Sequence, residues 1–144
     1  MKLVVYTDGG ARNNPGPAAI GVVITQKGQI LKKYSDFIGQ ATNNQAEYRA
    51  VIFALEKVKL LFGKKKARKM NIKVCLDSEL IAKHLSHQYK IKEKDLQPLF
   101  LKVWNLILDF EQVSFKYIPR QQNKEADQLV NQALDAQEKT QTLI

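Results

Sequence analysis

Apolar residues follow two different periods along this chain, and the period changes near residue 41. Residues 3–6, 18–25 and 30–38 form short apolar runs separated by turns, one of which carries Gly28. Such runs predict three β-strands, and their short connections predict an antiparallel meander. The third run mixes polar with apolar residues, which is typical of an edge or half-exposed strand.

Helical spacing begins after Thr42, which forms a capping box with Gln45 three residues later. The helix behind this box should end near Gly63, and its apolar positions are Ala50, Val51, Ala54, Leu55, Val58, Leu61 and Phe62. Two further apolar runs predict strands, and three amphipathic stretches predict helices. The strands are expected at 72–76 and 113–118, and the helices at 78–87, 95–109 and from Asn123, a candidate N-cap, onward.

This order of elements predicts a single α/β domain over residues 1–144, with a five-stranded mixed sheet flanked by helices. The first three strands should be antiparallel. A long helix separates the third strand from the fourth, so the last two strands should run parallel to a neighbour. The polar tail from about 137 to 144 is expected to fray.

Four smaller expectations follow from individual side chains. Trp104 lies on an apolar helical stripe and is expected in the core, whereas His84 and His87 are expected on the surface. Cys75 lies within an apolar run, which predicts a packed, inert thiol. The basic run 64–69 is equally well explained as a solvated loop or as a nucleic-acid contact.

The chain is strongly basic, with 23 Lys and Arg against 14 Asp and Glu and a formal charge of +9. This charge favours a polyanionic partner such as nucleic acid, although surplus lysine also serves solubility. Met1 and Lys2 lead directly into the first strand, and no stretch approaches the ~20 apolar residues of a membrane span. Together with the single cysteine, these features lead us to expect a cytoplasmic monomer with no membrane partner.

Four acidic residues occupy positions that point toward the protein interior. Asp8 and Asp77 each end an apolar strand, Glu47 lies on the apolar stripe of the first helix, and Asp127 borders the stripe of the last helix. Two of these positions also have an ordinary structural explanation: an Asx turn for Asp8, and a helix first-turn acid for Asp127.

Together the four acids suggest a metal site. In sheets with helical crossovers, ligands bind beyond the carboxyl ends of the strands. If the strands of Asp8 and Asp77 are neighbours, both carboxylates can reach one ion. Clustered carboxylates repel each other unless cations neutralise them, and an all-oxygen ligand set favours Mg²⁺ or Mn²⁺. Two such ions about 4 Å apart can promote hydrolysis of a phosphodiester.

Short motifs around these acids resemble type 1 ribonuclease H. The motifs are Asp8-Gly9-Gly10 with Asn14-Pro15-Gly16, then Thr42-Asn43-Asn44 with Ala46-Glu47, then Asp77-Ser78, and finally Asn123 with Ala126-Asp127. They occur in the family's order, and the resemblance extends from Met1 to about Leu134. Each motif alone is weak, but the ordered set of four is highly specific.

The resemblance implies a ribonuclease H-like fold and an endonuclease that hydrolyses the RNA strand of RNA/DNA hybrids, leaving 5′-phosphate and 3′-hydroxyl ends. It implies two Mg²⁺ ions, with Mn²⁺ as a substitute. Asp8 would bridge both ions, Glu47 and Asp77 would hold the ion near the leaving group, and Asp127 would hold the ion that carries the attacking water. The substrate-binding residues that it implies, together with two nearby candidates from the last loop, are Gly9, Gly10, Asn14, Thr42, Asn43, Asn44, Arg120 and Asn123.

The chain departs from many family members in three places. The loop 118–122 has Arg120 but no histidine, which predicts a mildly altered rate. No lysine-rich protrusion follows the second helix, so hybrid binding must depend on Tyr89, Lys90, Lys92 or the run 64–69. We also expect no separate hybrid-binding module before Met1, which predicts low processivity. Two alternatives stay open: a catalytically silent nucleic-acid-binding domain, and a nuclease acting on DNA or on double-stranded RNA.

Overall fold

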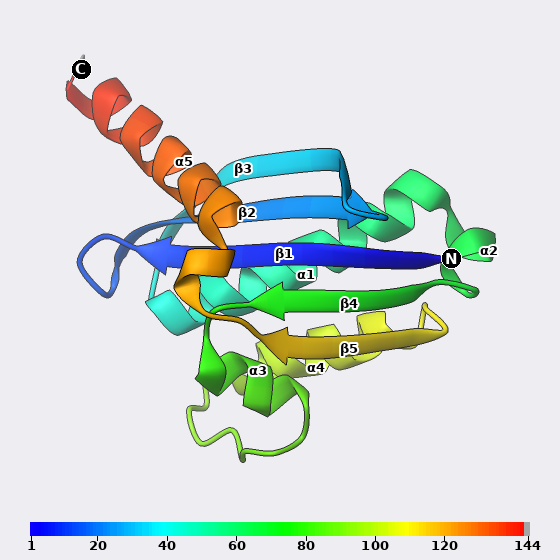
Figure 1. Ribbon diagram of the computed structural model, residues 1–144. Coiled ribbons are helices and arrows are strands. Elements are labelled where there is room, and N and C mark those ends of the chain that lie inside the picture. The colour runs from blue at the N-terminus through cyan, green and yellow to red at the C-terminus, as the bar shows by residue number, and fades with distance from the viewer. Residues whose placement is uncertain (143–144) are drawn as a thin grey trace.

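A five-stranded mixed sheet lies at the centre of the computed structural model, which describes residues 1–142 (Figure 1). The spatial order is β3-β2-β1-β4-β5, with β1, β2 and β3 antiparallel and with β4 and β5 parallel to β1. The strands are β1 (Lys2–Ala11), β2 (Gly16–Gln26), β3 (Gln29–Ala41), β4 (Asn71–Leu76) and β5 (Gln112–Tyr117). The predicted fold class is therefore confirmed, as is the position of β3 at the sheet edge.

Helices cover the two faces of the sheet unequally. Helices α1, α3 and α4 lie on one face, and α5 lies on the other, where it crosses β2 (Figure 1). The helices are α1 (Asn43–Phe62), α2 (Lys64–Ala67), α3 (Glu79–Leu85), α4 (Gln97–Ile107) and α5 (Lys124–Thr142), with a 3-10 turn η1 (Arg120–Gln122) before α5. Within residues 1–142, no helix has both the length and the hydropathy needed to cross a membrane.

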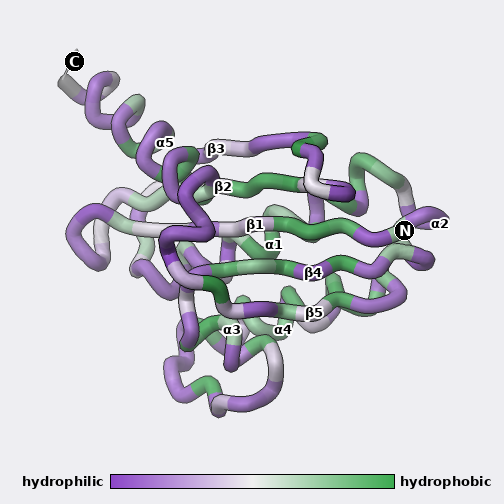
Figure 2. Tube along the Cα trace, viewed as in Figure 1, coloured by the Kyte–Doolittle hydropathy of each residue, from purple (hydrophilic) through white to green (hydrophobic). Residues whose placement is uncertain are grey.

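The main hydrophobic core lies between the sheet and the helices α1, α3 and α4. Hydrophobic residues are concentrated along β1, β2 and β4, whereas much of β3 and α5 is hydrophilic (Figure 2). Helix α1 begins with the predicted capping box: the Thr42 hydroxyl accepts from Gln45 N at 3.1 Å, and Thr42 N donates to Gln45 Oε1 at 2.9 Å. This cap fixes the start of the helix that carries Glu47.

The prediction of a frayed tail was wrong as far as Thr142, because α5 continues to that residue. One reason is an ion pair: Arg12, in the turn between β1 and β2, contacts Glu138 at 2.7 Å. Thr140 also hydrogen-bonds back to the Ala136 carbonyl at 3.0 Å. Residues 143 and 144, which belonged to the same prediction, lie outside the described residues.

Two side chains lie opposite to where the sequence suggested. Trp104 is 45% exposed, because its neighbour Val103 points into the core and turns the indole toward solvent. His84 is buried at 2% exposure, and its Nδ1 hydrogen-bonds the Tyr48 hydroxyl at 3.0 Å. Burial also lowers the pKa of His84, which favours the neutral ring. His87 is exposed, as predicted.

Two other predictions agree with the structure in substance. Cys75 is buried, and that burial raises the pKa of its thiol, as expected for a packed, inert side chain. The lysines of the basic run 64–69 are exposed, as expected for a solvated segment, although Lys64–Ala67 form a short helix and only residues 68 and 69 form a turn. Buried Ala67 and Met70 anchor this segment to the core.

Candidate active site

A polar cleft opens at the carboxyl ends of β1 and β4, with a volume of about 440 Å³. Residues from five separate segments line it, and most of them are polar, charged or glycine. They include all four predicted acids, namely Asp8, Glu47, Asp77 and Asp127, and also Gly9, Gly10, Arg12, Asn43, Asn44, Arg120 and Asn131. The cleft therefore gathers most of the residues that the sequence motifs singled out.

The parallel pairing of β1 with β4 brings Asp8 and Asp77 together. Thr7 pairs with Leu76, so each acid follows directly after a paired residue. Glu47 joins them from α1, and one carboxylate oxygen from each of the three acids lies within 4.8 Å of the others. The expectation that the two strands are neighbours is confirmed.

Gly9 explains how α1 comes close enough to β1 for Glu47 to join the strand carboxylates. The Gly9 amide donates to Glu47 Oε1 at 2.5 Å. A Cβ atom at this position would lie 2.2 Å from the Ala46 carbonyl oxygen, far inside van der Waals contact. A side chain larger than hydrogen would therefore push helix and strand apart.

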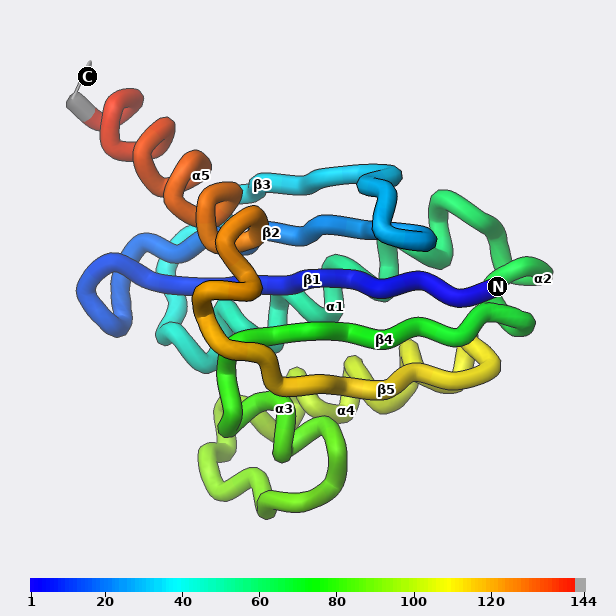
Figure 3. The backbone as a smooth tube through the Cα atoms, in the orientation of Figure 1, coloured from blue at the N-terminus to red at the C-terminus, as the bar shows by residue number. Residues whose placement is uncertain are grey.

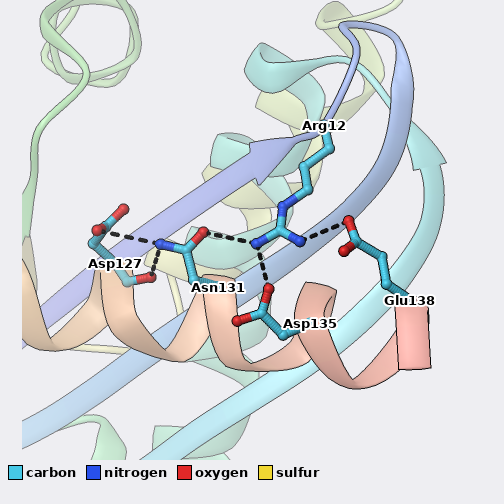
Figure 4. Close-up of polar contacts among 5 residues, drawn as sticks. All are labelled: Arg12, Asp127, Asn131, Asp135 and Glu138. Atoms are coloured by element: carbon cyan, nitrogen blue, oxygen red, sulfur yellow. Dashed lines mark hydrogen bonds and ion pairs between the residues drawn. The ribbon is translucent and has the colours of Figure 1, made fainter. Parts of the chain in front are cut away.

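Asp127, in the first turn of α5, lines the same cleft but is not part of the group of three. Its negative charge raises the pKa of Asp8, so the two carboxyls are near each other. Asn131, one turn later, donates through Nδ2 to the Asp127 carbonyl at 3.2 Å and to Asp127 Oδ2 at 3.4 Å (Figure 4). The structure thus assembles three acids at one point and holds the fourth near Asp8.

The acids disfavour one another's charge. Burial, and then the charge of Asp77, raise the pKa of Asp8 to about 7. Burial and the charge of Asp8 raise the pKa of Glu47 well above its ordinary value. Burial also raises the pKa of Asp77, although the Asn123 hydrogen bond and the charge of Arg120 oppose this. At neutral pH the cluster therefore favours either bound protons or bound cations.

Divalent cations fit this group of donors. All the ligand atoms offered are carboxylate oxygens, which hard cations such as Mg²⁺, Mn²⁺ and Ca²⁺ prefer. Glu47 Oε2 is buried and has no hydrogen-bond partner within residues 1–142. A buried carboxylate oxygen without a partner is costly, and a bound cation would remove that cost.

The predicted substrate-binding residues near α1 form a connected rim beside the cleft. Asn43 N donates to Asn14 Oδ1 at 2.9 Å, and Asn43 Oδ1 accepts from Ala11 N at 2.8 Å. Asn44 lines the cleft, and Thr42 caps the same helix. These bonds join the turn between β1 and β2 to the start of α1.

The segment between β5 and α5 passes over the ends of β4 and β1 (Figure 3). Arg120 is exposed within this segment and lines the cleft. Asn123 precedes α5, and its carbonyl accepts from Asp127 N at 3.1 Å, as an N-cap carbonyl does. Its side chain is buried and donates to the Thr7 carbonyl at 2.9 Å and to Asp77 Oδ2 at 3.3 Å.

The sequence did not single out Arg12 and Asn131. The Arg12 guanidinium contacts Asp135 at 2.8 Å, Glu138 at 2.7 Å and Asn131 Oδ1 at 3.3 Å (Figure 4). These partners lie more than 100 residues from Arg12, as the 119-residue separation from Asn131 illustrates. One signal was present: Asp127, Asn131 and Asp135 recur every four residues and so share one face of the last helix.

The basic candidates for hybrid binding lie at different ends of the molecule. Helix α2 precedes β4, so the run 64–69 lies at the end of the sheet opposite the acids (Figure 1). Tyr89, Lys90 and Lys92 are exposed in the segment after α3, and α3 itself begins two residues after Asp77. Of the two groups, the segment after α3 is the one toward the end of the sheet that carries the acids (Figure 1).

Known proteins share both the sequence pattern and the fold. The family described as reverse transcriptase-like matches residues 6–133. The structure of LC11-RNase H1 in complex with an RNA/DNA hybrid is 44% identical, with a TM-score of 0.88, covering 93% of this chain and 97% of that one. The chain belongs to the type 1 ribonuclease H family. Among curated proteins, the ribonuclease HI of Halobacterium salinarum is 40% identical over 135 residues, covering 93% of this chain and 65% of that protein.

Some relatives in this ribonuclease H family are much longer than this chain. A protein of Mycobacterium tuberculosis described as bifunctional is 37% identical over 138 residues, which is 94% of this chain. The chain spans only 36% of the length of that relative.

We expect the metal-free protein to lose stability as the pH rises from about 4 to about 7. Asp8 has an ordinary pKa of 3.8 and a pKa of about 7 in the folded protein. A carboxyl with a raised folded-state pKa binds more protons folded than unfolded within that window. Its contribution to stability is fully present below the unfolded-state pKa and is lost as the pH rises through the folded-state pKa. Urea unfolding in EDTA at stepped pH measures this trend.

The Asp8→Asn variant serves as the test of cause, because it removes the group that titrates. Its stability should vary less with pH, and at pH 7 without metal it should exceed that of the wild-type protein. A divalent cation should stabilise the wild type more than this variant. Asp36→Asn, an exposed acid on β3, is the matched control and should behave like the wild type. Wild-type stability that rises between pH 4 and 7 would contradict the expectation.

Proposed function

We propose that this chain is an endoribonuclease that hydrolyses the RNA strand of RNA/DNA hybrids, leaving 5′-phosphate and 3′-hydroxyl ends. The observation that carries the proposal is the convergence of Asp8, Glu47 and Asp77 within 4.8 Å at the carboxyl ends of β1 and β4. LC11-RNase H1, which has the same fold, was solved with an RNA/DNA hybrid. The net charge of +9 suits a polyanionic substrate.

In this proposal, two Mg²⁺ ions supply an activated water and stabilise the leaving oxygen. Asp8 interacts with each of the other three acids and would hold both ions, with Glu47 and Asp77 sharing one and Asp127 holding the second. Mn²⁺ has similar ligand preferences and should substitute. The surrounding residues orient these carboxylates through the Gly9 amide, the Asn123 amide and the Asn131 amide.

The rim of Asn14, Asn43, Asn44 and Thr42 would contact the sugar-phosphate backbones and the minor groove. A-like duplexes display their 2′-hydroxyls in a wide, shallow minor groove, so amide side chains can recognise RNA by its chemistry and shape. Gly10 leaves open space, since a Cβ there would meet nothing closer than 3.8 Å. The backbone at Gly10 can therefore approach the substrate closely, whereas the missing side chain of Gly9 allows α1 to approach β1.

Arg120 and Asn123 take different parts in this proposal. Arg120 is exposed at the cleft, where many relatives have a histidine, and would contact a phosphate of the substrate or product. Asn123 is 2% exposed and bonds Asp77, so we propose that it positions this ligand and does not touch the substrate. Tyr89, Lys90 and Lys92 would contact the DNA strand.

The remaining features of the proposal concern the state of the protein. The proposal keeps the expectation of a monomer that acts as one catalytic domain. The single buried cysteine suits the reducing cytoplasm. The main competing function is a silent nucleic-acid-binding domain, and the four acids gathered at one cleft favour cleavage over that alternative.

Cleavage of end-labelled substrates tests this function. We expect Mg²⁺- or Mn²⁺-dependent cutting of the RNA strand of the hybrid and no cutting in EDTA, with double-stranded RNA and double-stranded DNA as competing substrates. Asp8→Asn should lower the rate by at least about 1000-fold, because metal-assisted water activation contributes several kcal/mol.

Helix α1 offers a test variant and a matched control for the cleavage assay. Glu47→Gln should abolish cutting, while Glu56→Gln, an exposed acid on the same helix, should leave it unchanged. Tight hybrid binding without any cutting would refute the nuclease proposal and favour the silent binding domain. Cutting confined to double-stranded RNA or DNA would refute the assigned substrate.

Asn131→Ala should raise the Mg²⁺ concentration needed for half-maximal rate, because Asn131 orients Asp127. Residues that orient metal ligands typically affect metal affinity by about 10-fold or more. The KM for the hybrid should stay unchanged, and stabilisation of the protein by Mg²⁺ in thermal unfolding should shift in parallel. Gln132→Ala, an exposed neighbour, is the control. An unchanged Mg²⁺ requirement would show that Asn131 does not position Asp127.

A further inference from the structure

The face of the sheet opposite α1 is only partly covered. Helix α5 lies over β2 and β3 and crosses β1, and no helix of residues 1–142 lies over β4 and β5 on that face (Figure 1). Residues Leu3, Val5, Ile72, Val74, Val113 and Phe115 point into the main core on the helical face. Because strand side chains alternate, the residues between them point to the uncovered face.

Three lysines lie on this uncovered face, one on each strand. They are Lys2 on β1, Lys73 on β4 and Lys116 on β5. Strand register places Lys73 opposite Val4 and Ser114, and Lys116 opposite Cys75. The lysines are therefore diagonal neighbours, roughly 7–8 Å apart at their Cβ atoms, and form a single row across the sheet.

The row carries positive charge that nothing in the structure neutralises. All three lysines are exposed, and none forms an ion pair within the described residues 1–142. Lys73 is two residues before buried Cys75 on β4, and Lys116 pairs with Cys75 from β5, so both lysines lie near it. Glu125, an acid near this face, is already paired with Lys33 at 3.3 Å.

Polar groups accompany the lysines. A groove of about 270 Å³ lies at the amino ends of the strands and is lined by Lys2, Val4, Asn71, Lys73, Gln112 and Ser114 among others. Tyr6 is half-buried on the same face and pairs with Cys75 in the register. Lysines, amides, a hydroxyl and one aromatic ring on an open sheet are the combination with which proteins bind single-stranded nucleic acid.

We propose that Lys2, Lys73 and Lys116 form a second nucleic-acid surface, which binds a single-stranded extension of the hybrid substrate through its phosphates. The row is one lysine wide, so it matches one backbone and not the two backbones of a duplex. The surface lies outside the cleft and extends beyond the proposed catalytic function. Its binding test needs neither metal nor cleavage, so failure of one proposal is distinguishable from failure of the other.

The position of the row explains why an extension of the substrate would reach it. Tyr6, in register with the strand position of Lys116, is two residues before Asp8, which corresponds to about 7 Å along the strand. Lys73 and Lys2 then continue away from the cleft toward the end of the sheet that carries α2. The exposed cations Lys64, Lys65, Lys66, Arg68 and Lys69 lie at that end (Figure 1).

Fluorescence anisotropy with a labelled single-stranded DNA of about 15 nucleotides, in EDTA and at several salt concentrations, tests the surface. The triple variant Lys2→Gln, Lys73→Gln, Lys116→Gln should bind more weakly. Each lost phosphate contact on a single strand lowers the salt slope by about 0.7, so the slope should fall by about 2. All three side chains are exposed, and unchanged thermal unfolding would confirm an intact fold.

A matched control keeps the net charge equal. The triple variant Lys27→Gln, Lys102→Gln, Lys139→Gln removes three other exposed lysines, so both variants change the formal charge from +9 to +6. The control should keep the wild-type salt slope. An equal loss in both variants would mean that only net charge matters, and would overturn the proposal. A loss confined to duplex binding would overturn the assigned occupant.

Cleavage kinetics provide a second test of this surface. With blunt hybrid, the variant of the lysine row should have the wild-type kcat and KM. With a hybrid carrying a single-stranded extension, the wild type should show a lower KM than with blunt hybrid, and the variant should lose this advantage at unchanged kcat. An advantage that persists in the variant would contradict the proposal.

Discussion

Mutual repulsion among three crowded carboxylates, two of them buried, is the constraint on which the rest of this structure depends. Asp8, Glu47 and Asp77 lie within 4.8 Å of one another, and burial raises the pKa of each. Such a group survives only if stronger interactions elsewhere hold its backbone in place. Those interactions are the parallel pairing of β1 with β4, the capping box at Thr42 and the contact of α1 with β1 at Gly9. The destabilised site is also what makes cation binding favourable.

The fourth acid is held by a separate set of contacts. Arg12 leaves the turn between β1 and β2 and pairs with Asp135 and Glu138 of α5, and Asn131 connects this pair to Asp127. The same turn bonds the start of α1 through Asn14 and Asn43. One turn therefore joins the rim that would contact substrate to the helix that carries Asp127. A movement on one side of the cleft would be transmitted to the other side through this turn.

Sequence reasoning predicted that the acids would come together because their positions follow general rules. Asp8 and Asp77 end strands joined by a crossover, which fixes the edge of the sheet at which they meet. Glu47 follows from the apolar stripe of its helix. Trp104 was misplaced because periodicity gives the direction of an apolar helical stripe but not its width. His84 was misplaced because periodicity does not show that a buried histidine can hydrogen-bond Tyr48. The end of α5 depends on Arg12, whose contacts no local pattern contains.

The most direct test of this account is to soak crystals of the wild-type protein and of the Asn131→Ala variant with Mn²⁺. Anomalous scattering then locates the ions in both. The account predicts Mn²⁺ in contact with Asp8, Glu47 and Asp77, and a second ion about 4 Å away on the side of Asp127 in the wild type. Asn131→Ala should weaken the second peak more than the first. Crystals in which Mn²⁺ binds elsewhere, with these carboxylates uncoordinated, would contradict the central claim.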